Sequence, residues 1–107
     1  MNTNMAAKVF AELGNETRLA ILLLLIKSGR EGLSIAGIQA HLEIPLSTLS
    51  FHIQALASAG LVERERQGRM VMCRPNFAVL NEAVAYLKRE CCVGVGKSAR
   101  ARKAAAG

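Results

Sequence analysis

The chain has 107 residues, and 51% of them are hydrophobic, which is enough for one packed domain and leaves no room for a second core. Trp is absent and only four residues are Phe or Tyr, which disfavours a protein that stacks single-stranded nucleic acid on exposed rings. The net charge is +6, and four of the fourteen basic residues lie in the last eleven positions. This excess of positive charge favours a polyanionic partner.

The sequence also bears on location and on chemistry. Its longest apolar run, residues 19–26, is far shorter than the ~20 residues that cross a bilayer, and the first residues do not resemble a secretory signal. We therefore expect a cytoplasmic protein with no membrane association, in which the three cysteines are free thiols. We expect no enzyme, because the sequence shows neither a nucleophile–base–acid constellation nor a Gly-rich phosphate loop.

Three helices are predicted in the first part of the chain. Apolar residues at 5, 9, 10 and 13 mark an amphipathic helix that ends near Gly14. Asn15 can cap a second helix, whose residues 19–26 are apolar on all sides and therefore predict a central, buried helix. Ser34 can cap a third helix over roughly residues 35–43.

A fourth helix is predicted from about residue 46 to 59, after Pro45. Leu49, Ile53 and Leu56 are spaced i, i+4, i+7 and form its apolar face. Its other face is polar and uncharged, with Ser47, Thr48, Ser50, His52 and Gln54. A short third helix, a tight joint and a longer fourth helix are typical of a helix-turn-helix.

The second half of the chain predicts a hairpin and a last helix. Strands are expected at 61–66 and 69–74 around Gln67-Gly68, and Asn76 can cap the helix that follows. Apolar residues at 77, 80, 84, 87 and 91 form a narrow seam of the kind that a partner helix covers. The predicted fold is therefore mainly α with a small β-hairpin (α+β), a homodimeric winged helix-turn-helix of order ααααββα.

This domain is expected to occupy residues 1–92 and to combine DNA binding with dimerisation. Residues 93–107 are small and basic and lack apolar periodicity, which predicts a mobile tail. The tail is either a non-specific clamp on DNA or a solvated end.

The polar face of the fourth helix suits double-stranded DNA. Short polar side chains there can hydrogen-bond to base edges in the major groove, and Gln54 suits adenine. Arg64, Arg66 and Arg69 surround the tip of the hairpin and suit phosphates or a minor groove. Two alternatives remain open: a winged helix that binds another protein without DNA, and a His52 that is only a hydrogen-bonding group on the helix surface. A steep fall of affinity with salt would distinguish DNA binding from a protein interface.

Three segments resemble the ArsR/SmtB family of bacterial metalloregulatory repressors. Residues 10–22 (FAELGNETRLAIL) are similar to the family's "ALSDPTRLRIL" opening. Residues 49–56 (LSFHIQAL) and 59–62 (AGLV) resemble its "VSxHLxxLxxAGLV" recognition helix, and 66–71 (RQGRMV) its "RxGRxV" wing. The resemblance covers roughly residues 8–92. It implies a homodimer formed by the first and last helices, an imperfectly palindromic operator, and repression that an inducer relieves.

The resemblance also suggests an inducer. Ser34 and Ala36 stand where many arsenic and cadmium sensors of the family carry Cys-x-Cys, and the last helix lacks the His and Asp ligands of its zinc sensors. The pair Cys91-Cys92 looks like the adjacent cysteines with which some members bind trivalent arsenic or antimony. No third Cys follows, so two thiolates suit an organoarsenical, whereas arsenite needs a further ligand such as glutathione, hydroxide or Cys73 of a partner chain. No permanent cofactor is expected.

Other interpretations of the cysteines remain. Cys91 continues the apolar seam, so it could be a packing residue, and the pair could instead be a thiol redox switch. Cys73 could be an ordinary buried strand residue. We expect Cys91 and Cys92 at the end of the last helix, where adjacent side chains diverge by ~100°, so binding of one arsenic by both should unwind or distort the last turn. That distortion would change the spacing of the two recognition helices in a dimer.

Overall fold

Side-chain caps begin four of the five α-helices in the computed structural model, which describes residues 1–96. In each case an Asn or Ser oxygen accepts the backbone N–H three residues ahead. The caps Asn15, Ser34 and Asn76 are therefore confirmed. The capped helices are α1 (Thr3–Leu13), α2 (Glu16–Ser28), α3 (Ile35–Leu42) and α5 (Phe77–Lys88), whereas α4 (Leu46–Ser58) follows Pro45 without a side-chain cap.

Three antiparallel strands form the sheet, in the order β1-β3-β2. The predicted hairpin is present as β2 (Val62–Gln67) and β3 (Met70–Pro75). Its two-residue turn is Gly68-Arg69, one position later than predicted, because Gly68 with φ +63° takes the first turn position. A third strand, β1 (Leu33–Ser34), was not predicted and pairs with β3. It can do so because Gly32 precedes it: a Cβ there would lie 2.0 Å from the Cys73 carbonyl oxygen.

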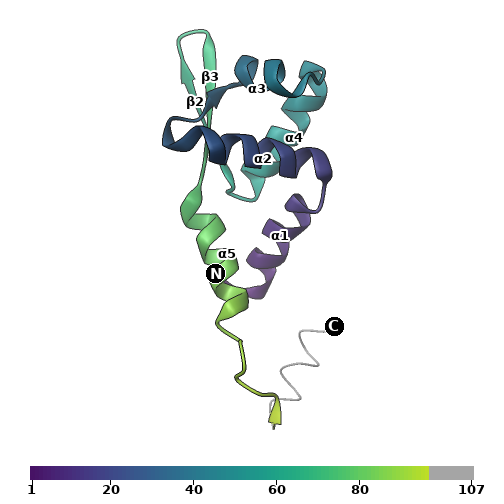
Figure 1. The fold of residues 1–107 in the computed structure, drawn as a ribbon, viewed down its shortest axis with the longest axis vertical. Coiled ribbons are helices and arrows are strands. Elements are labelled where there is room, and N and C mark those ends of the chain that lie inside the picture. The colour runs from purple at the N-terminus through teal and green to yellow at the C-terminus, as the bar shows by residue number, and fades with distance from the viewer. Residues whose placement is uncertain (97–107) are drawn as a thin grey trace.

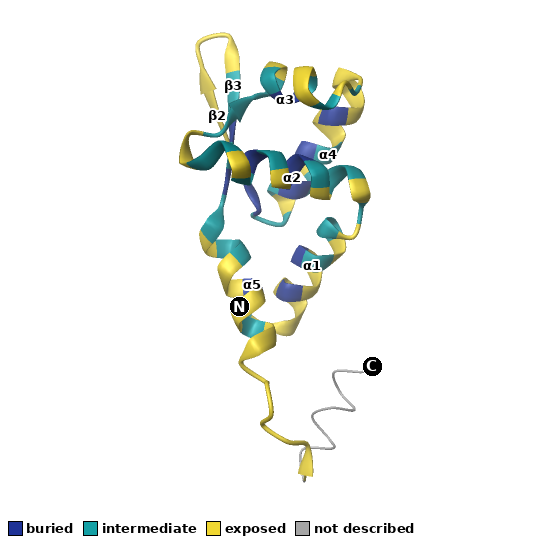
Figure 2. Ribbon diagram, viewed as in Figure 1, coloured by how far each residue is buried: buried dark blue, intermediate teal, exposed yellow. Residues whose placement is uncertain are grey.

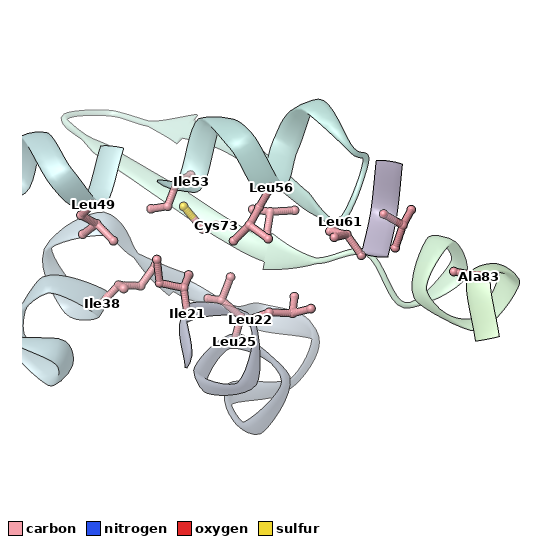
Figure 3. Packing of buried hydrophobic residues seen from close by; sticks show 12 residues of the cluster. Ile21, Leu22, Leu25, Ile38, Leu49, Ile53, Leu56, Leu61, Cys73 and Ala83 are labelled. Atoms are coloured by element: carbon pink, nitrogen blue, oxygen red, sulfur yellow. The ribbon is translucent and has the colours of Figure 1, made fainter. Parts of the chain in front are cut away.

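The core lies between the helices and one face of this sheet. Figure 1 shows α2 crossing the middle of the molecule, with α3, α4 and the hairpin on one side of it and α1 and α5 on the other. The buried residues come from every helix and from two strands, as Figure 3 shows for most of them. They are Val9, Ile21, Leu22, Leu25, Ile38, Leu49, Ile53, Leu56, Leu61, Val62, Cys73 and Ala83. The fold class, a winged helix with mainly α structure, is confirmed.

The last helix ends earlier than its apolar seam predicts. α5 ends at Lys88, and the chain continues through turns closed by weaker i→i+3 hydrogen bonds, including Cys91 N–H to the Lys88 carbonyl. Cys92 then takes a left-handed conformation with φ +60°. The expectation that the cysteine pair belongs to the last helical turn is therefore wrong. Within residues 1–96, no helix is long and apolar enough to cross a membrane. From residue 97 on, the predicted basic tail lies outside the described residues.

Candidate DNA-binding face and thiol pair

Helix α4 presents its polar face outward because its apolar face is held by the core. Leu49, Ile53 and Leu56 are completely buried, and their i, i+4, i+7 spacing fixes the rotation of the helix. The predicted residues Ser47, Thr48, Ser50 and Gln54 are all exposed on the remaining surface. The structure thus brings together four of the five polar side chains that we expect to face DNA.

His52 is the exception, since it turns toward α2. Its ring is half-buried, and its Nδ1 accepts a hydrogen bond of 3.2 Å from Arg18 Nε. Arg18 Nη1 also lies 3.1 Å from the carboxylate of Glu12, so one guanidinium joins α1, α2 and α4. The geometry favours the alternative interpretation of His52 as a hydrogen-bonding group on the helix surface. Sequence reasoning did not single out Arg18, whose only signal is its place in the segment that resembles the family opening.

Phe51 also belongs to this face, although its apolar side chain does not mark it as a DNA-contacting residue in the sequence. It is 63% exposed and lies on the side of α4 opposite the buried stripe. Its ring meets the His52 ring edge-on, with centroids 5.5 Å apart, and Arg18 Cζ lies 6.0 Å from its centroid. The helical period alone could have placed it, because position 51 falls on the outward side when 49, 53 and 56 point inward.

The hairpin separates its charges between its two faces. Side chains alternate along a strand, so Arg64 and Arg66 share the face of the buried Val62, which is the face that carries the helices. Glu63 and Glu65 lie on the opposite face. Arg66 and the turn residue Arg69 are exposed, and Figure 2 shows that the whole tip of the hairpin is open to solvent. Arginines of the wing and the polar face of α4 are therefore presented on the same side of the sheet.

The acidic face of the hairpin is neutralised locally. Glu65 Oε1 accepts hydrogen bonds from Arg74 Nη1 at 2.7 Å and from Gln67 Nε2 at 3.1 Å. These bonds, with the positive charge of Arg74, hold the pKa of the Glu65 carboxyl below its usual value. Arg74 is thus engaged with Glu65, and Arg66 and Arg69 form no ion pair within residues 1–96.

Cys91 and Cys92 form an exposed pair just beyond α5. Their sulfur atoms lie 3.5 Å apart, and both side chains are open to solvent. The left-handed conformation of Cys92 turns its side chain back toward Cys91, where a continuous helix would have separated the two. The turn therefore already brings both sulfurs within reach of one soft ion.

Cys73 lies far from this pair in a different environment. It is fully buried in β3, beside core residues of α4 (Figure 3), and burial raises the pKa of its thiol despite the nearby charge of Arg64. The length of α5, ~18 Å at ~1.5 Å per residue, lies between it and the pair. The interpretation of Cys73 as a buried strand residue is confirmed. In the part of the chain that the structure describes, no three His, Cys, Asp or Glu side chains gather as a metal-binding group.

Comparison with known proteins agrees with this architecture. The family described as "Helix-turn-helix domain" matches residues 13–65. A curated relative, an uncharacterized HTH-type transcriptional regulator of Methanocaldococcus jannaschii, is 36% identical over 63 residues, which cover 59% of this chain and 68% of that protein.

Solved structures give the same result over more of the chain. An ArsR-like transcriptional regulator from Rhodococcus sp. RHA1 is 33% identical, with a TM-score of 0.71 over 95% of this chain and 89% of that one. A homodimeric winged helix-turn-helix domain of Mycobacterium bovis, a possible ArsR-family regulator, is 31% identical, with a TM-score of 0.64 over 83% of this chain and 82% of that one. The antimony-specific transcriptional repressor AntR is 28% identical, with a TM-score of 0.59 over 74% of this chain and 70% of that one.

The buried stripe of α4, its exposed polar face and the basic hairpin define a winged helix-turn-helix transcriptional regulator with a DNA-binding domain. Its relatives are regulators and not enzymes, as the sequence predicts. The chain belongs to the ArsR family.

Proposed function

We propose that this regulator is a homodimeric repressor that leaves its operator when a trivalent arsenical or antimonial binds Cys91 and Cys92. The observation that carries the proposal is the pair of exposed sulfur atoms 3.5 Å apart, immediately after the helix that bears the predicted dimer seam. The AntR relative, whose name states that it is specific for antimony, supports the same class of ligand.

The dimer is supported by an apolar surface that the chain does not cover itself. In α5, Ala83 is buried against the rest of the chain, whereas Val84 and Leu87 on the predicted seam are 42% and 59% exposed. Met5 of α1, the helix beside α5, is also exposed. Exposed apolar residues on two adjoining helices suit a second copy of this chain, and the Mycobacterium bovis relative is a homodimer. Two recognition helices related by twofold symmetry would read an imperfectly palindromic operator.

DNA contact would come from α4 and the wing together. Ser47, Thr48, Ser50 and Gln54 would face base edges in the major groove, while Arg66 and Arg69 would contact phosphates or a minor groove. Each arginine that neutralises a phosphate releases a counterion, so the affinity should fall steeply as salt rises.

The thiol pair suits a ligand that needs two sulfurs. Each thiol gives its proton to one hydroxyl group on arsenic, which leaves as water as the arsenic–sulfur bond forms. A monosubstituted arsenical is then complete, because its third bond goes to carbon, whereas arsenite or antimonite keeps a hydroxide or takes a thiol from glutathione. We leave Cys73 out of the site, because its side chain is fully buried in the core of its own chain.

Induction would act through the turn that carries the pair. Because the sulfurs are already adjacent, ligand binding does not need to unwind α5. It would instead lock residues 89–92, one turn away from Leu87 on the dimer seam, in one conformation. Locking this segment would favour an arrangement of the two α5 helices that binds the operator less tightly. A coupling of about 1–3 kcal/mol, or about 5–150-fold in operator affinity, is typical of such linkage and sufficient for induction.

The test is fluorescence anisotropy of the reduced protein on a duplex from its own upstream region, with phenylarsine oxide, arsenite and peroxide added in separate titrations. We expect salt-sensitive binding and release by phenylarsine oxide at one molecule per chain. Cys91→Ser and Cys92→Ser should keep operator affinity and lose release. Cys73→Ala is the matched control, which should respond as the native protein does, and a native-state thiol assay should count two fast thiols and one protected.

Each other outcome has a definite meaning. Release by peroxide and not by arsenicals would replace the proposal with a thiol redox switch, which the exposure of both sulfurs also permits. Loss of DNA binding in Cys91→Ser would make that residue structural. Absence of salt-sensitive binding to any duplex, including those from a random-sequence pool, would favour a winged helix that binds another protein.

A further inference from the structure

Phe51 is the most exposed large apolar side chain of α4, and its neighbours on the outward side of the helix are polar. It is 63% exposed, and its neighbours on the outward side of α4 are Ser47, Ser50 and Gln54, all exposed. Burial of Leu49 and Ile53 fixes the rotation of the helix, so position 51 cannot turn inward without removing these residues from the core. The chain therefore holds a phenyl ring in water at the centre of its expected DNA-binding face.

The ring is also oriented by its neighbours. The His52 ring meets it at 68° with centroids 5.5 Å apart, and the Arg18 guanidinium lies 6.0 Å from its centroid. His52 in turn is held by its hydrogen bond to Arg18, which is paired with Glu12 of α1. The Arg18 guanidinium of α2 and the His52 ring of α4 thus border the phenyl ring, which otherwise stays open to solvent.

We propose that Phe51 contacts the 5-methyl group of a thymine in each operator half-site and so selects thymine at that position. This inference rests on the proposed DNA-binding function. Among the groups that base pairs present in the major groove, the thymine methyl is the apolar one, and Phe is among the side chains that contact it. Phe51 has no hydrogen-bonding group, so the surrounding polar side chains read donors and acceptors while the ring reads the methyl.

Continuity with the DNA-binding face favours DNA over a protein partner as the occupant. Phe51 shares its helix face with the polar side chains that suit base edges, and the exposed apolar residues of the dimer seam, Val84 and Leu87, lie on a different helix. A single ring among short polar residues also fits a methyl group better than an extended apolar protein surface, which would need further exposed apolar neighbours.

The experiment replaces thymine by deoxyuridine, which keeps every hydrogen-bonding group and removes only the methyl. The duplex would be the tightest binder selected from a random-sequence pool, and each thymine would be replaced singly and then in symmetric pairs. We expect one thymine per half-site at which replacement weakens binding of the native protein about fourfold, and about 15-fold for the symmetric pair, as for loss of one buried methyl-sized group at each site. In Phe51→Ala this penalty should vanish.

Leu23→Ala is the matched control, since Leu23 is likewise an exposed large apolar residue but lies on α2. This variant should keep both the native affinity and the native thymine penalty. Thermal unfolding of Phe51→Ala should match that of the native protein, because the ring is largely exposed. An equal deoxyuridine penalty in native protein and Phe51→Ala, or no penalty at any thymine, would overturn the inference while DNA binding stands. Failure to select any duplex would instead overturn the proposed function.

Discussion

Helices α4 and α5 are both amphipathic, but a single chain buries the whole apolar face of α4 and only part of that of α5. In the apolar stripe of α4, each side chain is at most 1% exposed, because residues of the same chain cover it. On α5, Ala83 alone is fully buried, and Val84 and Leu87 remain exposed. The rotation of α4 is therefore fixed by a core within one chain, whereas part of the apolar surface of α5 stays uncovered in a single chain. In the proposed mechanism, a ligand at the thiol pair would bias the packing of α5 while the DNA-binding face of α4 stays intact.

The largest effect on stability is expected from Leu56→Ala, which removes a side chain from the buried stripe of α4. Leu56 is fully buried between α4 and the sheet, so truncation removes its transfer free energy and leaves a cavity. We expect the free energy of unfolding to fall by about 2–5 kcal/mol. Urea unfolding followed by circular dichroism measures this loss. The same Leu→Ala change at Leu87, at a protein concentration low enough to keep the chain monomeric, serves as the control and should cost clearly less, because Leu87 is 59% exposed in a single chain. Equal losses at the two positions would contradict the division between the helices.

The next largest effect is expected on dimerisation, from a change in the exposed apolar seam of α5. Leu87→Ala removes an exposed apolar side chain from the α5 seam in both copies of the proposed dimer. If the seam is the interface, the dimerisation free energy should weaken by about 2 kcal/mol, which raises the dissociation constant roughly 30-fold. Analytical ultracentrifugation over a dilution series measures this constant. Leu23→Ala, on α2, should leave it unchanged, and a Leu87 variant with the native dissociation constant would place the interface elsewhere.

The sequence predicts the features that have local signals and misses those that depend on contacts between distant segments. The helices are predictable because local signals agree: Asn or Ser caps, glycine ends and an i, i+4, i+7 stripe that only one face can bury. The hairpin is predictable from the glycine-containing loop between two short strands, but the turn is displaced because Gly68 serves as the first of its two central residues. Strand β1 has two residues, too few to show a period, and depends on Gly32 allowing the backbone to approach β3.

The candidate site divides in the same way. Exposure of the polar residues of α4 follows from the buried stripe, and the sequence predicts it. His52 could not be placed, because its orientation depends on Arg18, which lies 34 residues earlier in the chain. Extending the seam to Cys91 gave a helix that is too long, because the left-handed conformation at Cys92 leaves no trace in apolar spacing. The close approach of the two sulfurs is thus a property of the turn that periodicity cannot reveal.

The smallest effect is expected on the solvent-exposed face of the hairpin that carries Glu63 and Glu65, away from the core. The hydrogen bonds from Arg74 and Gln67 lower the pKa of Glu65, so their contribution to stability is present above the usual carboxyl pKa and is lost as the pH falls through the lowered value. Glu65→Gln should therefore lower the urea midpoint slightly at about pH 7, and less at high salt because the pair is exposed. Glu63→Gln is the matched control, since Glu63 lies on the same hairpin face and has no ion pair within residues 1–96. The difference between the two variants should shrink as the pH falls through the lowered pKa of Glu65, because protonation of its carboxyl removes the charge that Arg74 pairs with. If it persisted below that pKa, packing of the side chain, and not its charge, would hold Glu65 against Arg74.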